Sequence, residues 1–323
     1  MSSFTRIVLV GAAIVFCAGG AVGAAPAPSG ALLERYLGRG PWFETGDDQV
    51  RAWAAPGWER EAERVVLAAA GSVPRIAAAL DLRPQDVLPL WIVVAPGGGR
   101  FEVEAPSWSA ALARPSRHLV VVSGPALHAA RMNVQETMAH EVAHVALGER
   151  LGEIGWMPRW MHEGLAVHYS NYRRLRDRFV FWGRGPVHLR DLEHSFPQNP
   201  TRARAAYLES HAAVLHMLEI APITTLLDRL RAGEEFDAAF VAVYGITPVA
   251  FADHVDGEVA RRWRYLAVVA SGSSIFGMLT LLFVVAVSVK RIRDRRRRRQ
   301  WEAEEAELEL VPEAVTRSES PDA

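Results

Sequence analysis

Two histidines four residues apart place the strongest constraint on how this chain can fold. They stand in the string His140-Glu141-Val142-Ala143-His144. On a helix, residues four apart lie on one face, one turn from each other. Neutral imidazoles at this spacing can bind one metal ion together, and the glutamate beside the first histidine can act as a general base. The string therefore predicts a helix that carries two zinc ligands.

The residues around the string favour a helix as well. Asn133 followed by Glu136 is a typical helix start, and Gly148 is expected to end the helix. Apolar residues recur at helical spacing at positions 134, 138, 142 and 145. Two surface or core histidines on an ordinary helix are the alternative interpretation of His140 and His144.

A zinc site of this kind needs a third protein ligand and an open position for water. Glu163 is the preferred candidate, because the 18 residues between it and His144 allow the first helix to end and a second one to begin near Pro158. His162 competes for this role. Neighbouring helix positions diverge by about 100°, so only one of the two can face the metal, and we favour Glu163.

The chain resembles the gluzincins, and within them the small peptidase MA-like proteins of bacteria. The resemblance rests on His140, His144 and the spacing to Glu163. Residues 157–166 read Met-Pro-Arg-Trp-Met-His-Glu-Gly-Leu-Ala, which is similar to the family's Leu-Pro-x-Trp-Leu-x-Glu-Gly-Leu-Ala. Segments 195–197 and 206–210 look like the family's downstream region, so the likeness covers roughly residues 85–260.

This resemblance implies that His140, His144 and Glu163 bind one Zn²⁺ per chain and that Glu141 is the general base. It further implies that Tyr207 stabilises an oxyanion and that a sheet edge binds extended peptide. A tyrosine in this sequence context, on an amphipathic helix, is more often a core or boundary residue, and this is the alternative interpretation of Tyr207.

Two functions are compatible with these residues. The expected one is a zinc metallopeptidase that hydrolyses peptide bonds in protein or peptide substrates. The alternative is a non-catalytic receptor or scaffold that retains the peptidase fold to bind envelope polypeptides. The presence of Glu141 together with all three ligands favours the enzyme.

Both ends of the chain predict a membrane-anchored protein. Residues 1–24 have the pattern of a secretory signal peptide, for which an uncleaved anchor is the alternative. Leu266–Val289 is free of charged residues and long enough to cross a bilayer. Basic residues dominate 290–299 and mark the cytoplasmic side. The peptidase part is therefore expected outside the membrane and the basic-then-acidic tail, residues 290–323, inside.

Composition adds three points. Lys290 is the only lysine among 36 basic residues, a pattern typical of GC-rich genomes, so we expect a bacterial source. The membrane predicted above would then be the cytoplasmic membrane of a bacterium. Cys17, the only cysteine, lies in the predicted signal, so the mature chain would contain no disulfide. The net charge of −1 gives no indication of a nucleic-acid partner, and the sequence does not indicate an oligomeric state.

The predicted fold is α+β, with residues 25–265 forming one extracytoplasmic domain. Apolar runs at 88–94 and 119–122 predict strands of a small mixed sheet packed on the zinc-site helix. A helix is predicted over 52–80. The C-terminal half is predicted to be helical, with helices over 205–218, 223–232, 236–244 and 248–262, followed by one transmembrane helix.

Overall fold

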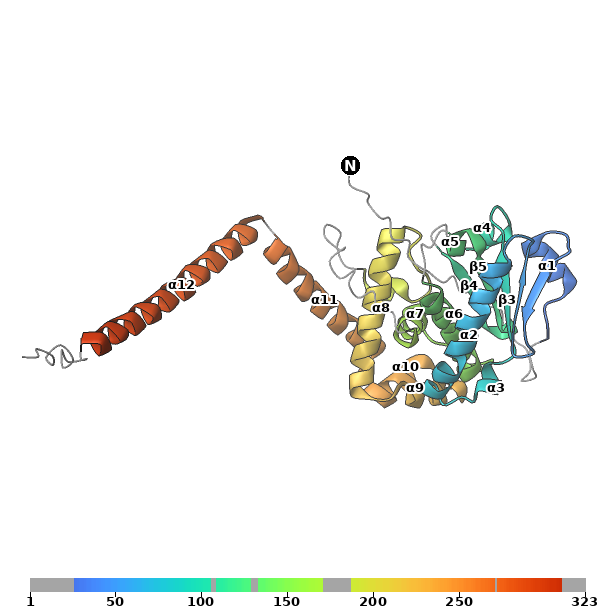
Figure 1. Cartoon of the computed structure of the whole chain (residues 1–323). Coiled ribbons are helices and arrows are strands. Elements are labelled where there is room, and N and C mark those ends of the chain that lie inside the picture. Colours follow the sequence, from blue (N-terminus) through green and yellow to red (C-terminus); the bar gives the residue numbers. More distant parts are fainter. Residues whose placement is uncertain (1–25, 106–108, 129–132, 171–186, 271, 310–323) are drawn as a thin grey trace, which may run out of the picture. The chain divides into compact units, whose positions relative to one another are not determined.

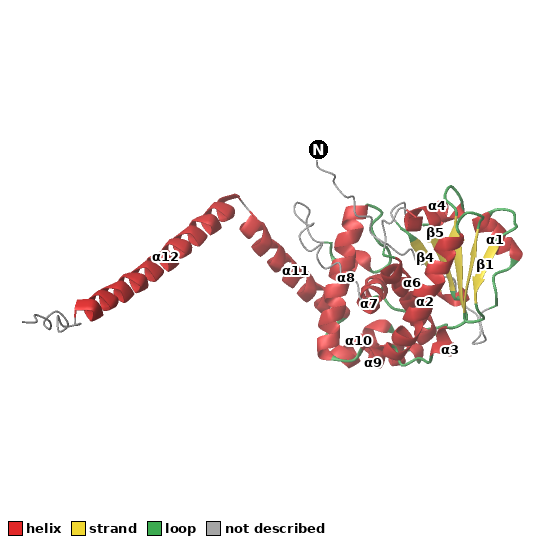
Figure 2. Cartoon of the chain, in the orientation of Figure 1, coloured by secondary structure: helices red, strands yellow, loops and turns green. Residues whose placement is uncertain are grey.

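The computed structural model describes residues 26–105, 109–128, 133–170, 187–270 and 272–309. The chain divides into two compact units, one ending at Ala260 and the other beginning at Arg261. The first unit combines a five-stranded mixed sheet with a mostly helical remainder (Figures 1 and 2), which confirms the α+β class. The predicted signal peptide, residues 1–24, and the end of the tail from residue 310 lie outside the described residues.

The sheet has the strand order β1-β2-β3-β5-β4. Its two edge pairs, β1 with β2 and β4 with β5, are antiparallel, whereas the central pairs β2–β3 and β3–β5 are parallel. The strands are β1 (Phe43–Gly46), β2 (Val50–Ala54), β3 (Leu90–Ala95), β4 (Ala111–Arg114) and β5 (Leu119–Ser123).

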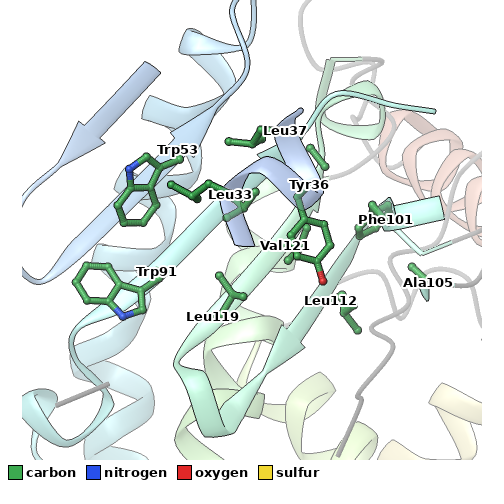
Figure 3. Packing of buried hydrophobic residues seen from close by; sticks show 12 residues of the cluster. Leu33, Tyr36, Leu37, Trp53, Trp91, Phe101, Ala105, Leu112, Leu119 and Val121 are labelled. Carbon is green, nitrogen blue, oxygen red and sulfur yellow. The ribbon is translucent and has the colours of Figure 1, made fainter. Parts of the chain in front are cut away.

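Helices cover both faces of the sheet, and every residue of β3 and β5 is accordingly buried. Helices α1 (Gly30–Leu37) and α4 (Arg100–Glu104) lie on one face. Side chains that alternate along the strands, among them Trp91 and Val121, pack there against Leu33 and Tyr36 (Figure 3). Helices α2 (Glu59–Ala79) and α6 (Val134–Leu151) pack on the sheet as well, α2 against β2 and α6 against β4.

The helix predicted over 52–80 is wrong at its start. Residues 50–54 form β2, which pairs with β1 on one side and β3 on the other, and α2 begins only at Glu59. Pairing with strands distant in sequence overrides the local helical pattern here. Pro74 lies inside α2.

Helix α6 begins at Val134, and the Asn133 side chain accepts hydrogen bonds from the backbone N–H groups of Gln135 and Glu136, so the predicted start is confirmed. The predicted stop at Gly148 is wrong, because α6 continues to Leu151 and Gly152, at φ 69°, follows it. A Cβ on Gly148 would lie 2.4 Å from the Pro115 side chain. This glycine therefore permits a close contact rather than ending the helix.

The C-terminal half is helical, as predicted. It contains α7 (Arg159–Tyr169), α8 (Pro200–Ile220), α9 (Ile223–Arg231), α10 (Phe236–Tyr244) and α11 (Pro248–Ala270). Helix α7 packs between α6 and α8. Asn199 caps α8 by accepting hydrogen bonds from the N–H groups of Thr201 and Arg202, which explains why α8 starts five residues earlier than the predicted residue 205.

The segment predicted as one transmembrane helix, 266–289, is divided between α11 and α12 (Gly272–Glu309). Gly272 and the serines after it are weak helix formers, which suits the start of a helix. Among the residues whose placement is described, no single helix is long and apolar enough to cross a membrane. Two bent helix pairs, α8 with α9 and α10 with residues 248–261, satisfy the length and composition test together.

The close packing of α7 on α8 depends on Gly164. A Cβ at this position would lie 2.4 Å from the backbone oxygen of Ser210 and 2.7 Å from its carbonyl carbon, and backbone atoms cannot turn aside. We predict that Gly164→Ala lowers the free energy of unfolding by about 1–3 kcal/mol, measured by chemical denaturation.

Gly257→Ala is the matched control, because a Cβ at this helical position of α11 meets nothing within 4 Å. That variant should gain about 0.5–1 kcal/mol from helix propensity. Equal effects of the two substitutions would contradict the packing argument.

Candidate metal centre

Two packed helices bring three potential metal ligands together. Helix α6 supplies His140 and His144, and α7 supplies Glu163. The two Nε2 atoms are 3.1 Å apart, and Oε2 of Glu163 lies 3.5 Å from Nε2 of His140 and 3.4 Å from Nε2 of His144. In the described part of the chain, this is the one group of three or more His, Cys, Asp or Glu side chains whose ligand atoms lie within 4.8 Å of one another.

These three separations fit a single tetrahedral ion. Two ligand atoms bound about 2.1 Å from the same ion at the tetrahedral angle are about 3.4 Å apart. All three residues are buried, and neither oxygen of Glu163 nor Nδ1 of His144 has a hydrogen-bond partner within the described residues. Buried polar atoms without partners are costly, and a metal ion would compensate Oε2 of Glu163, the oxygen that lies nearest to the two histidines.

The charges of the group suit metal binding. Burial by itself raises the pKa of Glu163, but His144, His140 and Arg159 together hold this pKa well below its ordinary value. Burial lowers the pKa of His144, although Glu163 opposes the shift. These neighbours therefore favour the ionised form of the Glu163 carboxylate, which is the form that binds metal.

Glu141 lies on α6 between the two histidines and is fully buried. Burial, and then the charge of Glu163, raise the pKa of Glu141 well above its ordinary value. The backbone of Ala113, on the edge strand β4, favours the ionised form weakly, although neither Glu141 oxygen forms a hydrogen bond in the described structure. The helix thus places Glu141 between the candidate ligands and the edge of the sheet.

Tyr207 on α8 lies beside one of the candidate ligands, His140. Its ring lies 6.0 Å from the ring of His140, and the two rings are nearly perpendicular. Phe196 also packs against Tyr207, with the two ring centres 4.9 Å apart. His162 is also buried, but its ring lies 6.4 Å from that of His144 and its nitrogens do not join the group of three. Burial, and then the neighbouring His144, lower the pKa of His162 to about 3.

The sequence did not draw attention to two charged residues, Arg159 and Glu209. Arg159, the first residue of α7, has its Nε 3.6 Å from Oε1 of Glu163. Its spacing of four residues from Glu163 on the predicted second helix was the available signal. Glu209 lies on α8 two residues after Tyr207 and is buried. No local pattern marks a buried glutamate on a helix of mixed composition.

Comparison with known proteins gives no relative: no family model matches this chain, and no curated protein matches it.

We predict that Glu209 makes the stability of the domain depend on pH. Its two carboxylate oxygens accept the N–H of Val187 at 3.0 and 2.9 Å. Burial, opposed by that N–H and assisted by the charge of Asp256, raises the pKa of Glu209 from 4.5 to about 8. Between these two values the folded state holds a proton that the unfolded state has released. The free energy of unfolding should therefore fall as pH rises through this window, by at most about 1.4 kcal/mol per pH unit, and level off above it.

Glu209→Gln should flatten this slope, because an amide does not ionise. Thermal or denaturant unfolding between pH 5 and pH 9 measures the slope of the free energy of unfolding against pH. The difference between the two proteins should correspond to roughly one proton. Glu219→Gln, on the exposed end of the same helix, is the control for a generic loss of carboxylate. A Glu209→Gln slope as steep as that of the wild type would contradict this assignment.

Proposed function

We propose that this chain is a membrane-anchored zinc metallopeptidase that hydrolyses peptide bonds of extracytoplasmic protein or peptide substrates. The observation that carries the proposal is the set of three ligand-atom separations of 3.1, 3.5 and 3.4 Å, with Glu141 on the same helix as the two histidines. The resemblance of residues 140–166 to the gluzincins supports it.

Zinc is the proposed ion because two imidazoles and one carboxylate are the donor set that catalytic zinc sites use. Zinc held by such donors acts as a Lewis acid on a carbonyl and lowers the pKa of water. His140, His144 and Glu163 would hold the ion, one ion per chain. Their burial keeps the ligands in a fixed arrangement and strengthens their electrostatic effect on a substrate.

The other residues of the site have separate roles in the proposed reaction. Glu141 accepts a proton from the attacking water and returns it to the leaving amine, which is general acid–base catalysis. The phenol of Tyr207 is a candidate donor to the negative charge that develops on the peptide oxygen. Its position beside His140 supports this role.

The edge strand β4 is the proposed binding place for the substrate. It pairs with β5 on one side only, and Ala113 of this strand lies beside Glu141. An extended peptide can add to such an edge through backbone hydrogen bonds, which are independent of side-chain identity. Strand addition at a sheet edge is what the resemblance to the gluzincins implies, whereas Ala111, Leu112 and Ala113 of β4 are themselves buried in the described structure.

The proposed membrane anchor is the segment 266–289. Its described side chains on α12 are almost all exposed, among them Phe276, Leu281 and Phe283 at 76%, 64% and 69%. A helix whose apolar residues face all directions is typical of a lipid environment. The arginine-rich residues that follow favour a cytoplasmic position for the tail.

Reporter fusions test this topology. A reporter that works only outside the cytoplasm should be active when fused just before Arg261 and inactive when fused after Arg299. The opposite pattern would place the zinc site in the cytoplasm and contradict the proposed substrate class.

Three single substitutions test the chemistry. His140→Ala and His144→Ala should abolish stoichiometric zinc in elemental analysis. Glu141→Gln should retain zinc and fold, because it keeps size and hydrogen bonding, yet lose peptide cleavage by a factor on the order of 10²–10⁴ or more. Tyr207→Phe should lose a factor on the order of 10²–10³ if its phenol is the oxyanion donor.

His162→Ala is the matched control for the ligands, since it removes a buried histidine beside Glu163 and should leave zinc in place. Loss of zinc from this variant would transfer the third-ligand role to His162. A wild-type protein that binds zinc and cleaves no peptide, or a Glu141→Gln variant as active as the wild type, would replace the enzyme by the binding scaffold.

A further inference from the structure

Arg159 is held at one end of the metal-ligand group by several contacts. Its backbone N–H donates to the carbonyl oxygen of Glu193 at 2.8 Å. The guanidinium carbon lies 5.9 Å from the centre of the Phe196 ring, within the range of a cation–π contact. Nε lies 3.6 Å from Oε1 of Glu163, and the side chain is only 22% exposed. The guanidinium is therefore confined beside Glu163.

The two oxygens of Glu163 face different groups. Oε2 lies 3.5 and 3.4 Å from the Nε2 atoms of the two histidines, whereas Oε1 is the oxygen nearest to Arg159. Neither Oε1 nor Nε of Arg159 makes a hydrogen bond in the described structure, so the ion pair can shorten without breaking another contact. In this arrangement only one oxygen is directed at the metal position.

A carboxylate can bind a metal ion through one oxygen or through both. Binding through both would add a bond and raise the coordination number above the four of a tetrahedral site with three protein ligands and one water. A partly buried cation beside Oε1 opposes this, because that oxygen would lose its ion pair on turning to the metal. Polar groups behind a ligand commonly set its orientation and the affinity of the site.

We propose that Arg159 is a positioning residue that holds Oε1 of Glu163, so that Glu163 binds the metal through Oε2 alone. The proposal rests on the metal site described under the proposed function. In this role Arg159 does not contact the substrate. The ion pair between Arg159 and Glu163 on α7 determines both the affinity for the metal and its coordination number.

The zinc affinity of the full chain, measured by competition with a chelator, tests this role. Arg159→Met removes the charge and should weaken zinc binding by about 10–100-fold. Arg159→Lys keeps a positive charge without the planar fork and should recover part of the lost affinity. The measurement needs no peptide. If the chain binds zinc and cleaves no peptide, the proposed function is contradicted, but the zinc affinities of the variants still test the role of Arg159.

Cobalt substitution gives a second readout, which loss of packing alone would not move. The visible absorption of Co²⁺ weakens when its coordination number rises above four. Arg159→Met should show weaker bands than the wild type, because Glu163 becomes free to bind through both oxygens. Arg159→Lys should lie between the two.

Arg150→Met is the matched control. Arg150 is a buried arginine on α6 that pairs with Asp228 instead of a candidate ligand. Its loss should lower stability while leaving zinc affinity and the Co²⁺ spectrum as in the wild type. The proposal is overturned if Arg159→Met binds zinc as tightly as the wild type, or if its Co²⁺ spectrum is unchanged, or if Arg150→Met produces the same changes.

Discussion

The buried negative charge of Glu163 is the interaction on which the arrangement of the helical half depends. An ionised carboxylate away from water is costly unless opposite charges or donors surround it. Here the compensation comes from His140 and His144 on α6 and from Arg159 on α7 itself. Helices α6 and α7 must therefore lie at one particular angle and offset, because any other would leave the charge without its partners.

A second constraint acts on the opposite side of α7. Gly164 follows Glu163 directly and faces the backbone of Ser210 on α8. Because the two residues are adjacent on one helix, Glu163 faces α6 while Gly164 permits the close approach of α8. The same close approach brings Tyr207, one turn earlier on α8, to the ring of His140. The candidate metal ligand and the glycine that permits close helix packing are thus neighbours in a single turn of α7.

The sequence predicted what depends on local patterns and overlooked what depends on distant pairing. The start of α6 at Asn133 follows from a cap that involves three neighbouring residues. Strands β3 and β5 follow from their apolar runs. Strand β4 has only four residues, Ala-Leu-Ala-Arg, with no strong strand former, and exists because β5 pairs with it. Gly148 was misassigned because a glycine that admits Pro115 has the same local appearance as one that ends a helix. Within the site, helical periodicity predicted the direction of His140, Glu141 and His144, whereas the places of Arg159, Phe196 and Glu209 depend on the packing of three helices.

The contact between Gly148 and Pro115 also has a mechanical consequence. Pro115 begins the turn that leads out of β4, and Gly148 lies one helical turn after His144. His118, at the end of the same turn, adds a contact of 2.7 Å to Glu149. The end of the edge strand and the histidine pair are therefore fixed to one rigid segment of helix. A displacement of this helical segment would therefore move the end of the strand and the two histidines together.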